Sequence, residues 1–263
     1  TKKYSPKERL WYIRAKEVVI SSGSIERPLV FGNNDTPGVM LSSAAKEYLK
    51  VYGVLVGKKP LIFTNNDSGY ETAIEFKKNG IDPVILDTRK DPKSEIIDEA
   101  KNLNINIKFS YVVVVAKGYK KVKSADIAKI SEDKKELGAI ENVNCDCICV
   151  SGFWTPTIHL ASQSGNKTKF NKDIDAFVPG ISKQNETTLG AANGTFTLEE
   201  TLKNSFDSGY ELSKKITNND NKISFPIVVE KKSTEHDKFW CVPLPKGKTY
   251  KRFLDFQNDV AVS

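Results

Sequence analysis

The sequence predicts an α/β protein built from parallel strand–helix–strand units, and two observations carry the prediction. In the first half of the chain, an apolar run at 60–63, helically spaced apolar residues at 70–78 and a second apolar run at 83–86 follow one another. Two more segments lead to small residues: 15–20 is typical of an apolar strand, and 145–150 of a buried strand. Strands that alternate with helical segments in this way indicate βαβ crossovers and a parallel sheet.

Six residues connect the first strand of this crossover to its helix, namely Thr64, Asn65, Asn66, Asp67, Ser68 and Gly69. The dinucleotide-binding pattern G-x-G-x-x-G keeps only its third glycine here, as Gly69, where a small residue lets the helix approach the strand. Asn66 accepts a left-handed backbone more readily than most residues and would aim backbone N–H groups at a pyrophosphate. Asp67 and Ser68 are expected to cap the helix. An ordinary βαβ connection that binds nothing has the same pattern, so the motif leaves both interpretations open.

Asp87 ends the second strand of the crossover, near the distance of about 20 residues at which such units place a ribose-binding acid. A carboxylate there accepts hydrogen bonds from both ribose hydroxyls and repels a 2′-phosphate, which predicts that NAD is preferred to NADP. Arg89 qualifies this preference, because an arginine two residues further on would reach a phosphate.

The composition is that of a globular protein, with 39% hydrophobic and 28% charged residues and a mean hydropathy of −0.41. The longest apolar run, 111–116, is far shorter than the roughly 20 residues that a membrane helix needs, and the first residues lack a secretory apolar region. We therefore expect a cytoplasmic protein without membrane contact. The net charge of +7 comes from scattered lysines, so no nucleic-acid partner is expected.

Three of the four cysteines, Cys145, Cys147 and Cys149, are spaced by two, which would place them on one face of a strand. Zinc sites favour C-x2-C pairs, and flavin disulfide reductases need a closely spaced cysteine pair on a helix. Neither pattern is present. We expect buried thiols, no metal site and no catalytic residue in this chain.

Two strand ends share a pattern of small residues followed by proline. The early strand leads to Ser22 and Gly23, and the later one to Ser151 and Gly152. The pattern resembles the elements that carry the chain out of the FAD domain, and back into it, in flavoproteins with two dinucleotide-binding domains. The expected arrangement is part of an FAD domain at 1–44, an inserted NAD domain at 45–144, a return to the FAD domain at 145–222 and a C-terminal segment at 223–263.

Taken in order, the segments SGSIERPLVFGNNDTPGVM, TNNDSGYETA, VSGFWTPTIHLASQSG and FLDFQNDV resemble the α subunit of heterotetrameric sarcosine oxidase over nearly the whole chain. The turn TNND is the specific piece, an unusual Rossmann variant of the NAD domain in that family. The resemblance implies two Rossmann-like domains of the glutathione-reductase-like type. It assigns Asn65, Asn66, Asp67, Ser68 and Asp87 to NAD, Ser22 and Gly23 to the neighbourhood of FAD, and Ser151 and Gly152 to the NAD or interdomain region.

In that family, the α subunit binds FAD and NAD, while sarcosine is oxidised at an FMN held largely by the β subunit. The resemblance therefore also implies the β, γ and δ subunits as partners, and a tetrahydrofolate-binding domain further along α. This chain shows neither a first FAD-binding G-x-G-x-x-G unit nor a folate-binding continuation after FQNDV. We expect a central fragment with an incomplete FAD site, weak or absent FAD binding and no activity alone.

Other functions remain open. The α subunit of a related opine or amino-acid dehydrogenase would share the architecture and differ in its electron acceptor. A structural scaffold from another class would explain the loss of two motif glycines by binding no nucleotide at all. A self-contained pyridine-nucleotide disulfide reductase is disfavoured by the cysteine spacing.

Overall fold

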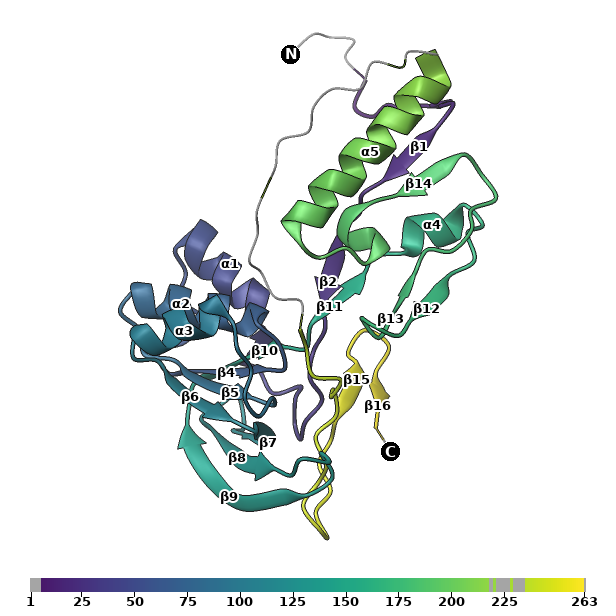
Figure 1. The fold of residues 1–263 in the computed structure, drawn as a ribbon. Helices are drawn as coiled ribbons and strands as arrows, with labels where there is room; N and C mark the ends of the chain where they lie inside the picture. The colour runs from purple at the N-terminus through teal and green to yellow at the C-terminus, as the bar shows by residue number, and fades with distance from the viewer. Residues whose placement is uncertain (1–5, 218–219, 221–227, 229–234, 263) are drawn as a thin grey trace. The chain divides into compact units, whose positions relative to one another are not determined.

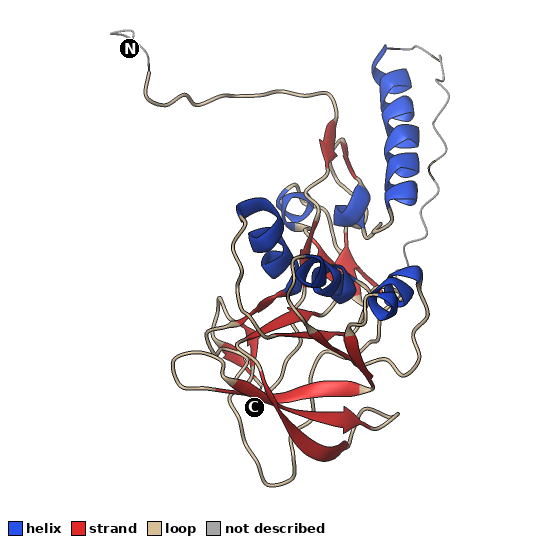
Figure 2. Ribbon diagram, turned by 90° about the vertical axis from the view of Figure 1, so that its left-hand side faces the viewer, coloured by secondary structure: helices blue, strands red, loops and turns tan. Residues whose placement is uncertain are grey.

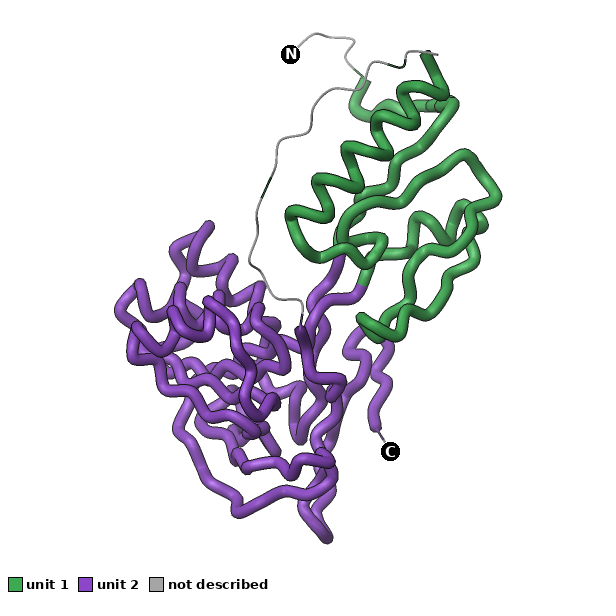
Figure 3. Tube along the Cα trace, in the orientation of Figure 1, with its two compact units in different colours: residues 1–23, 156–228 green, residues 24–155, 229–263 purple. Residues whose placement is uncertain are grey.

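The computed structural model describes residues 6–217, 220, 228 and 235–262, and the chain forms two compact units. Unit 1 contains 1–23 and 156–228, and unit 2 contains 24–155 and 229–263 (Figure 3). The chain passes between them at β2 (Ser24–Glu26) and β11 (Trp154–Pro156).

Unit 2 is built on a five-stranded parallel sheet with the strand order β3-β10-β4-β5-β6. Its strands are β3 (Val39–Leu41), β10 (Cys147–Ser151), β4 (Pro60–Thr64), β5 (Val84–Asp87) and β6 (Asn106–Phe109). Every residue of β4 and β10 is buried, as expected for central strands covered on both faces. The predicted crossover is therefore confirmed as a β4–α2–β5 unit.

Helices cover one face of this sheet and an antiparallel meander covers the other (Figures 1 and 2). The helices are α1 (Ser42–Tyr52), α2 (Ser68–Lys78) and α3 (Glu95–Asn102). The meander consists of β7 (Tyr111–Lys117), β8 (Ser124–Ile130) and β9 (Leu137–Asn144). Each face carries its own cluster of buried side chains, with Ile62 and Tyr70 on the helix side and Phe63 and Ile127 on the meander side.

The pairing of two strands that are distant in sequence, β3 and β10, explains why both lie in one unit. Because β3 and β10 pair with each other, both belong to the unit that contains the crossover. The compact units divide after Gly23 and after Thr155. The limits of the FAD and NAD domains expected at 44 and 144 stay predictions. The expected boundary at 222 lies outside the described residues. A last hairpin of unit 2, β15 (Phe253–Asp255) and β16 (Val260–Ala261), forms a two-stranded sheet of its own.

Unit 1 is assembled from short elements. Its strands are β1 (Val18–Ile20) paired in parallel with β14 (Glu186–Thr188), and β12 (Lys169–Asn171) paired antiparallel with β13 (Ala176–Val178). Its helices are α4 (His159–Gln163), the 3₁₀ turn η1 (Gly190–Asn193) and α5 (Leu198–Thr217). Thr197 caps the start of α5: its hydroxyl accepts the Glu200 N–H at 3.3 Å and donates to Glu200 Oε2 at 2.9 Å.

The three neighbouring cysteines are buried, as expected, but they do not share one face. Cys147 and Cys149 pack on the helix side of the sheet, whereas Cys145 precedes β10 and packs on the meander side. The expectation of a common face is wrong because the strand begins only at Cys147. Burial raises the pKa of the Cys145 thiol to about 12. Within the described residues, no cluster of His, Cys, Asp and Glu is arranged to hold a metal ion, and no helix has the length and apolarity to cross a membrane.

Candidate dinucleotide site at the strand ends

The fold brings together sequence-predicted residues from three distant segments at the carboxyl edge of the parallel sheet. Thr64 at the end of β4 pairs in register with Asp87 of β5 on one side and with Ser151 of β10 on the other. Ligands of open α/β sheets bind outside the carboxyl ends of such strands. We call this set, residues 64–69 with Asp87, Arg89, Ser151 and Gly152, the strand-end site. Ser22 and Gly23 belong to unit 1, where the Ser22 hydroxyl donates to the Thr157 carbonyl.

Asn66 organises the turn between β4 and α2. Its Nδ2 donates to the Ser151 carbonyl at 3.1 Å, and its Oδ1 accepts the Ser68 N–H at 2.8 Å. Asn66 therefore caps α2, and it does so without a left-handed backbone. The expected caps are wrong: Asp67 occupies the N-cap position without a capping hydrogen bond, and the Ser68 hydroxyl instead accepts from Trp154 Nε1 at 2.9 Å.

Two glycines of the site are required by close packing. A Cβ on Gly69 would lie 2.6 Å from Thr64 Cβ, so the expected close approach of helix and strand is confirmed. A Cβ on Gly152 would lie 2.7 Å from the Arg27 carbonyl oxygen, so the backbone at Arg27 already demands glycine there. Packing alone therefore explains why residue 152 is glycine, without a bound ligand.

The two charged residues that the sequence offered to a ribose or phosphate bind each other. Asp87 is fully buried, and its oxygens accept the Tyr70 hydroxyl at 2.8 Å, the Arg89 N–H at 2.9 Å and Arg89 Nη2 at 2.8 Å. Arg89 also pairs with Asp67 at 2.8 Å. Burial opposes the charge on Arg89, but the Asp87 and Asp67 carboxylates together raise its pKa. Complete burial raises the pKa of Asp87, and Arg89 and Tyr70 oppose that shift.

A segment that sequence reasoning missed covers the strand-end site. Residues 235–240, which we call the cover, run across the β4–α2 turn. Asn65 Nδ2 donates to the Asp237 carbonyl at 2.9 Å, and the Asp237 N–H donates to the Asn65 carbonyl at 2.8 Å. Asn66 pairs with His236 in an isolated antiparallel bridge. The β4–α2 turn is therefore hydrogen-bonded to the cover.

Side chains hold the cover at both ends. The Asp237 carboxylate accepts the Thr88 hydroxyl at 2.7 Å and pairs with Lys134 at 2.8 Å. The His236 ring stacks on Phe153 with ring centroids 3.9 Å apart, and Trp240 Nε1 donates to the Gly152 carbonyl at 3.0 Å. In this arrangement the cover contacts the turn and Arg89 engages Asp87, so the groups that the sequence assigned to NAD are bound to other residues of the chain.

No family model matches the chain. Comparison with curated proteins finds the sarcosine oxidase α subunits of Corynebacterium sp. (strain P-1), 31% identical over 98% of this chain, and of Rhizobium meliloti (strain 1021), 34% identical over 97%. The chain is homologous to part of the sarcosine oxidase α subunit. It spans only 27% and 24% of the lengths of these two relatives.

Among solved structures, thioredoxin reductase from T. acidophilum matches 69% of the chain, and 59% of its own, with a TM-score of 0.55 and 17% identity. L-proline dehydrogenase from P. horikoshii matches 76% of the chain, and 35% of its own, with a TM-score of 0.51 and 20% identity. These likenesses show the fold alone. The predicted fold class, an α/β protein resembling flavoproteins with two dinucleotide-binding domains, is confirmed.

Proposed function

We propose that the chain is a segment of the α subunit of a multi-subunit flavin-dependent amine oxidoreductase of the sarcosine oxidase type. The observation that carries the proposal is the similarity to sarcosine oxidase α subunits along almost all of the chain. The segment supports the complex and leaves oxidation of the C–N bond to an FMN held mainly by another subunit. The β, γ and δ subunits would be its partners, and tetrahydrofolate would bind elsewhere in the complex.

NAD is the dinucleotide that we assign to the strand-end site, and its entry requires the cover to move away. The start of α2 and the close approach at Gly69 support this proposal, because a helix N-terminus favours a pyrophosphate. Asp87 would turn from Arg89 to the ribose hydroxyls, so NAD would be preferred to NADP.

A scaffold without a nucleotide is the second candidate, and the cover is the observation that favours it. Asp67 and Asp87 share the single positive charge of Arg89, so this buried group is net negative and opposes a pyrophosphate. The α subunit of an opine or amino-acid dehydrogenase is an alternative within the oxidoreductase proposal. Such an enzyme would differ from the sarcosine oxidase type in its electron acceptor.

Calorimetric titration of the full chain with NAD tests the two candidates. Replacing Asp237 by Ala removes the contacts with Thr88 and Lys134, which weakens the closed state of the cover. We expect this variant to bind NAD about tenfold more tightly than the wild type. The reason is that a larger fraction of its molecules would have the cover open and the site free to bind. Asp98→Ala, which removes an exposed ion pair with Lys101, is the matched control and should leave the affinity unchanged.

Asp87→Asn in the Asp237→Ala background then locates the ligand. A loss of NAD affinity assigns the ribose to Asp87. Absence of binding heat in the wild type and in Asp237→Ala, both of them folded, would reject the NAD proposal and support the scaffold.

A further inference from the structure

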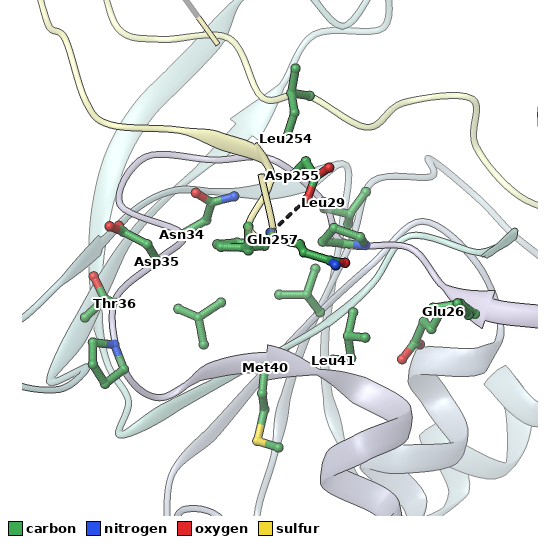
Figure 4. Close-up of a pocket in the computed structure, with 16 residues that line it drawn as sticks. Glu26, Leu29, Asn34, Asp35, Thr36, Met40, Leu41, Leu254, Asp255 and Gln257 are labelled. Carbon is green, nitrogen blue, oxygen red and sulfur yellow. Dashed lines mark hydrogen bonds between the residues drawn. The ribbon is translucent and has the colours of Figure 1, made fainter. Parts of the chain in front are cut away.

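Unit 2 contains a cavity of about 630 Å³ that shares no residue with the strand-end site. It lies between β3, the loop at 34–37 and the turn that follows β15 (Figure 4). Its walls are mainly apolar and include Leu29, Val39, Met40, Leu41, Val150 and Phe256. This volume is within the range of small-molecule sites, which combine apolar walls with a few polar groups.

The charged side chains of the cavity wall are all acidic. Glu26, Asp35 and Asp255 line it, and none of the described lining residues is Lys, Arg or His. Asp35 has a cation nearby, since it lies 3.7 Å from Lys251, whereas Asp255 accepts the neutral Gln257 N–H at 2.8 Å. Glu26 is the carboxylate that is buried deepest in the cavity wall.

Glu26 is 3% exposed. Oε2 accepts the Ser43 N–H in the first turn of α1 at 2.7 Å, whereas Oε1 is buried without a hydrogen-bond partner. Lys46, whose charge acts on Glu26, is already paired with Glu71 at 2.6 Å. Burial raises the pKa of Glu26, and hydrogen bonding from Ser43 and Ser151 and the charge of Lys46 only partly oppose this. A buried carboxyl oxygen without a donor is costly, and a ligand N–H would satisfy it.

We propose that this cavity binds a small protonated amine with an apolar body, whose ammonium group pairs with Glu26. The apolar body lies against the walls formed by Met40, Leu41 and Val150. A nucleotide or another anion would meet the carboxylates of Glu26 and Asp255, and no basic side chain is among the described lining residues. A purely apolar ligand would leave Oε1 without a donor.

Three probes of similar shape test the charge requirement: phenethylamine, phenethyl alcohol and phenylacetate, each titrated calorimetrically into the full chain at neutral pH. We expect the amine to bind at least about tenfold more tightly than the alcohol, because a buried charge pair adds to the same apolar contacts. Phenylacetate should not bind. An alcohol that binds as tightly as the amine, an acid that binds, or the absence of amine binding would overturn the proposal.

Two variants assign the binding to this cavity. Glu26→Gln should lower the affinity for phenethylamine about tenfold and leave that for phenethyl alcohol unchanged, since only the charge is lost. Gln257→Trp, at an exposed position of the lining, should fill the cavity and abolish binding of both. Asp82→Asn, an exposed carboxylate paired with Lys77, is the control and should bind like the wild type. Unchanged amine affinity in Gln257→Trp, or in folded Glu26→Gln, would contradict the assignment.

Discussion

In unit 2, buried side chains line both faces of a five-stranded parallel sheet, whereas in unit 1 the longest helix, α5, buries none of its residues. The parallel pair β1 and β14 is the counterpart of that sheet in unit 1, and Val18 and Val19 on β1 remain about half exposed, at 47% and 48%. Parallel strands are stable when helices or other layers cover both faces. The difference teaches that one chain can combine a unit with its own core and a unit that contributes little apolar burial.

The largest expected effect is the loss of stability when a core side chain of unit 2 is truncated. The comparison is truncation of a side chain on α5 in unit 1. Phe63 is fully buried and contacts Phe31 edge to face, with ring centroids 5.9 Å apart. Phe63→Ala should lower the free energy of unfolding by about 3–5 kcal/mol, whereas Leu202→Ala on the exposed α5 should cost less than about 1 kcal/mol. Denaturant unfolding measures both. Equal losses would break the comparison between the units.

The same glycine substitution should have opposite signs in the two units. Gly69→Ala places a Cβ against Thr64 and should destabilise the chain by about 1–3 kcal/mol through overpacking. A Cβ on Gly209 in α5 meets no atom within 4 Å. Gly209→Ala should therefore stabilise the helix by about 0.5–1 kcal/mol. Circular dichroism during thermal unfolding resolves the two signs, and a stabilising Gly69→Ala would show that α2 does not pack as described.

Two glutamates sharpen the comparison through their pH dependence. Burial raises the pKa of Glu26 above its ordinary value of 4.5, so the stability that Glu26 contributes is present below that pH and is lost as the pH rises through the folded-state pKa. Glu26→Gln should therefore stabilise the chain at neutral pH, by less than the effects above. The gain should shrink as the pH falls toward 4.5.

Glu186 of unit 1 should behave in the opposite way. Hydrogen bonding from Ser164 lowers the pKa of Glu186, so its contribution is present at neutral pH and is lost as the pH falls through the lowered folded-state pKa. Glu186→Gln should slightly destabilise the chain at neutral pH. Melting temperatures of the wild type and both variants between pH 4 and pH 8 measure the signs, and parallel curves for the two variants would contradict these electrostatic assignments.

Much of the architecture was predictable from short windows of sequence. The crossover that gives β4, α2 and β5 follows from apolar spacing, and the cap that Thr197 forms with Glu200 follows from residues three apart. Gly69 was predictable because the motif itself requires close packing of helix and strand. The resemblance to sarcosine oxidase α subunits likewise rests on contiguous motifs. In each case the interacting residues are neighbours in sequence or repeat with a regular period.

Only the tertiary structure decided how the candidate sites are arranged. The cover meets Asn65 from more than 170 residues away, and Asp237 and His236 carry no motif that would announce this contact. Arg89 turns to Asp87 because burial makes an unpaired charge expensive, and Glu26 caps α1 from a different strand. Local periodicity encodes which elements form, whereas the pairing of distant polar groups depends on which surfaces the packed elements bring together and desolvate.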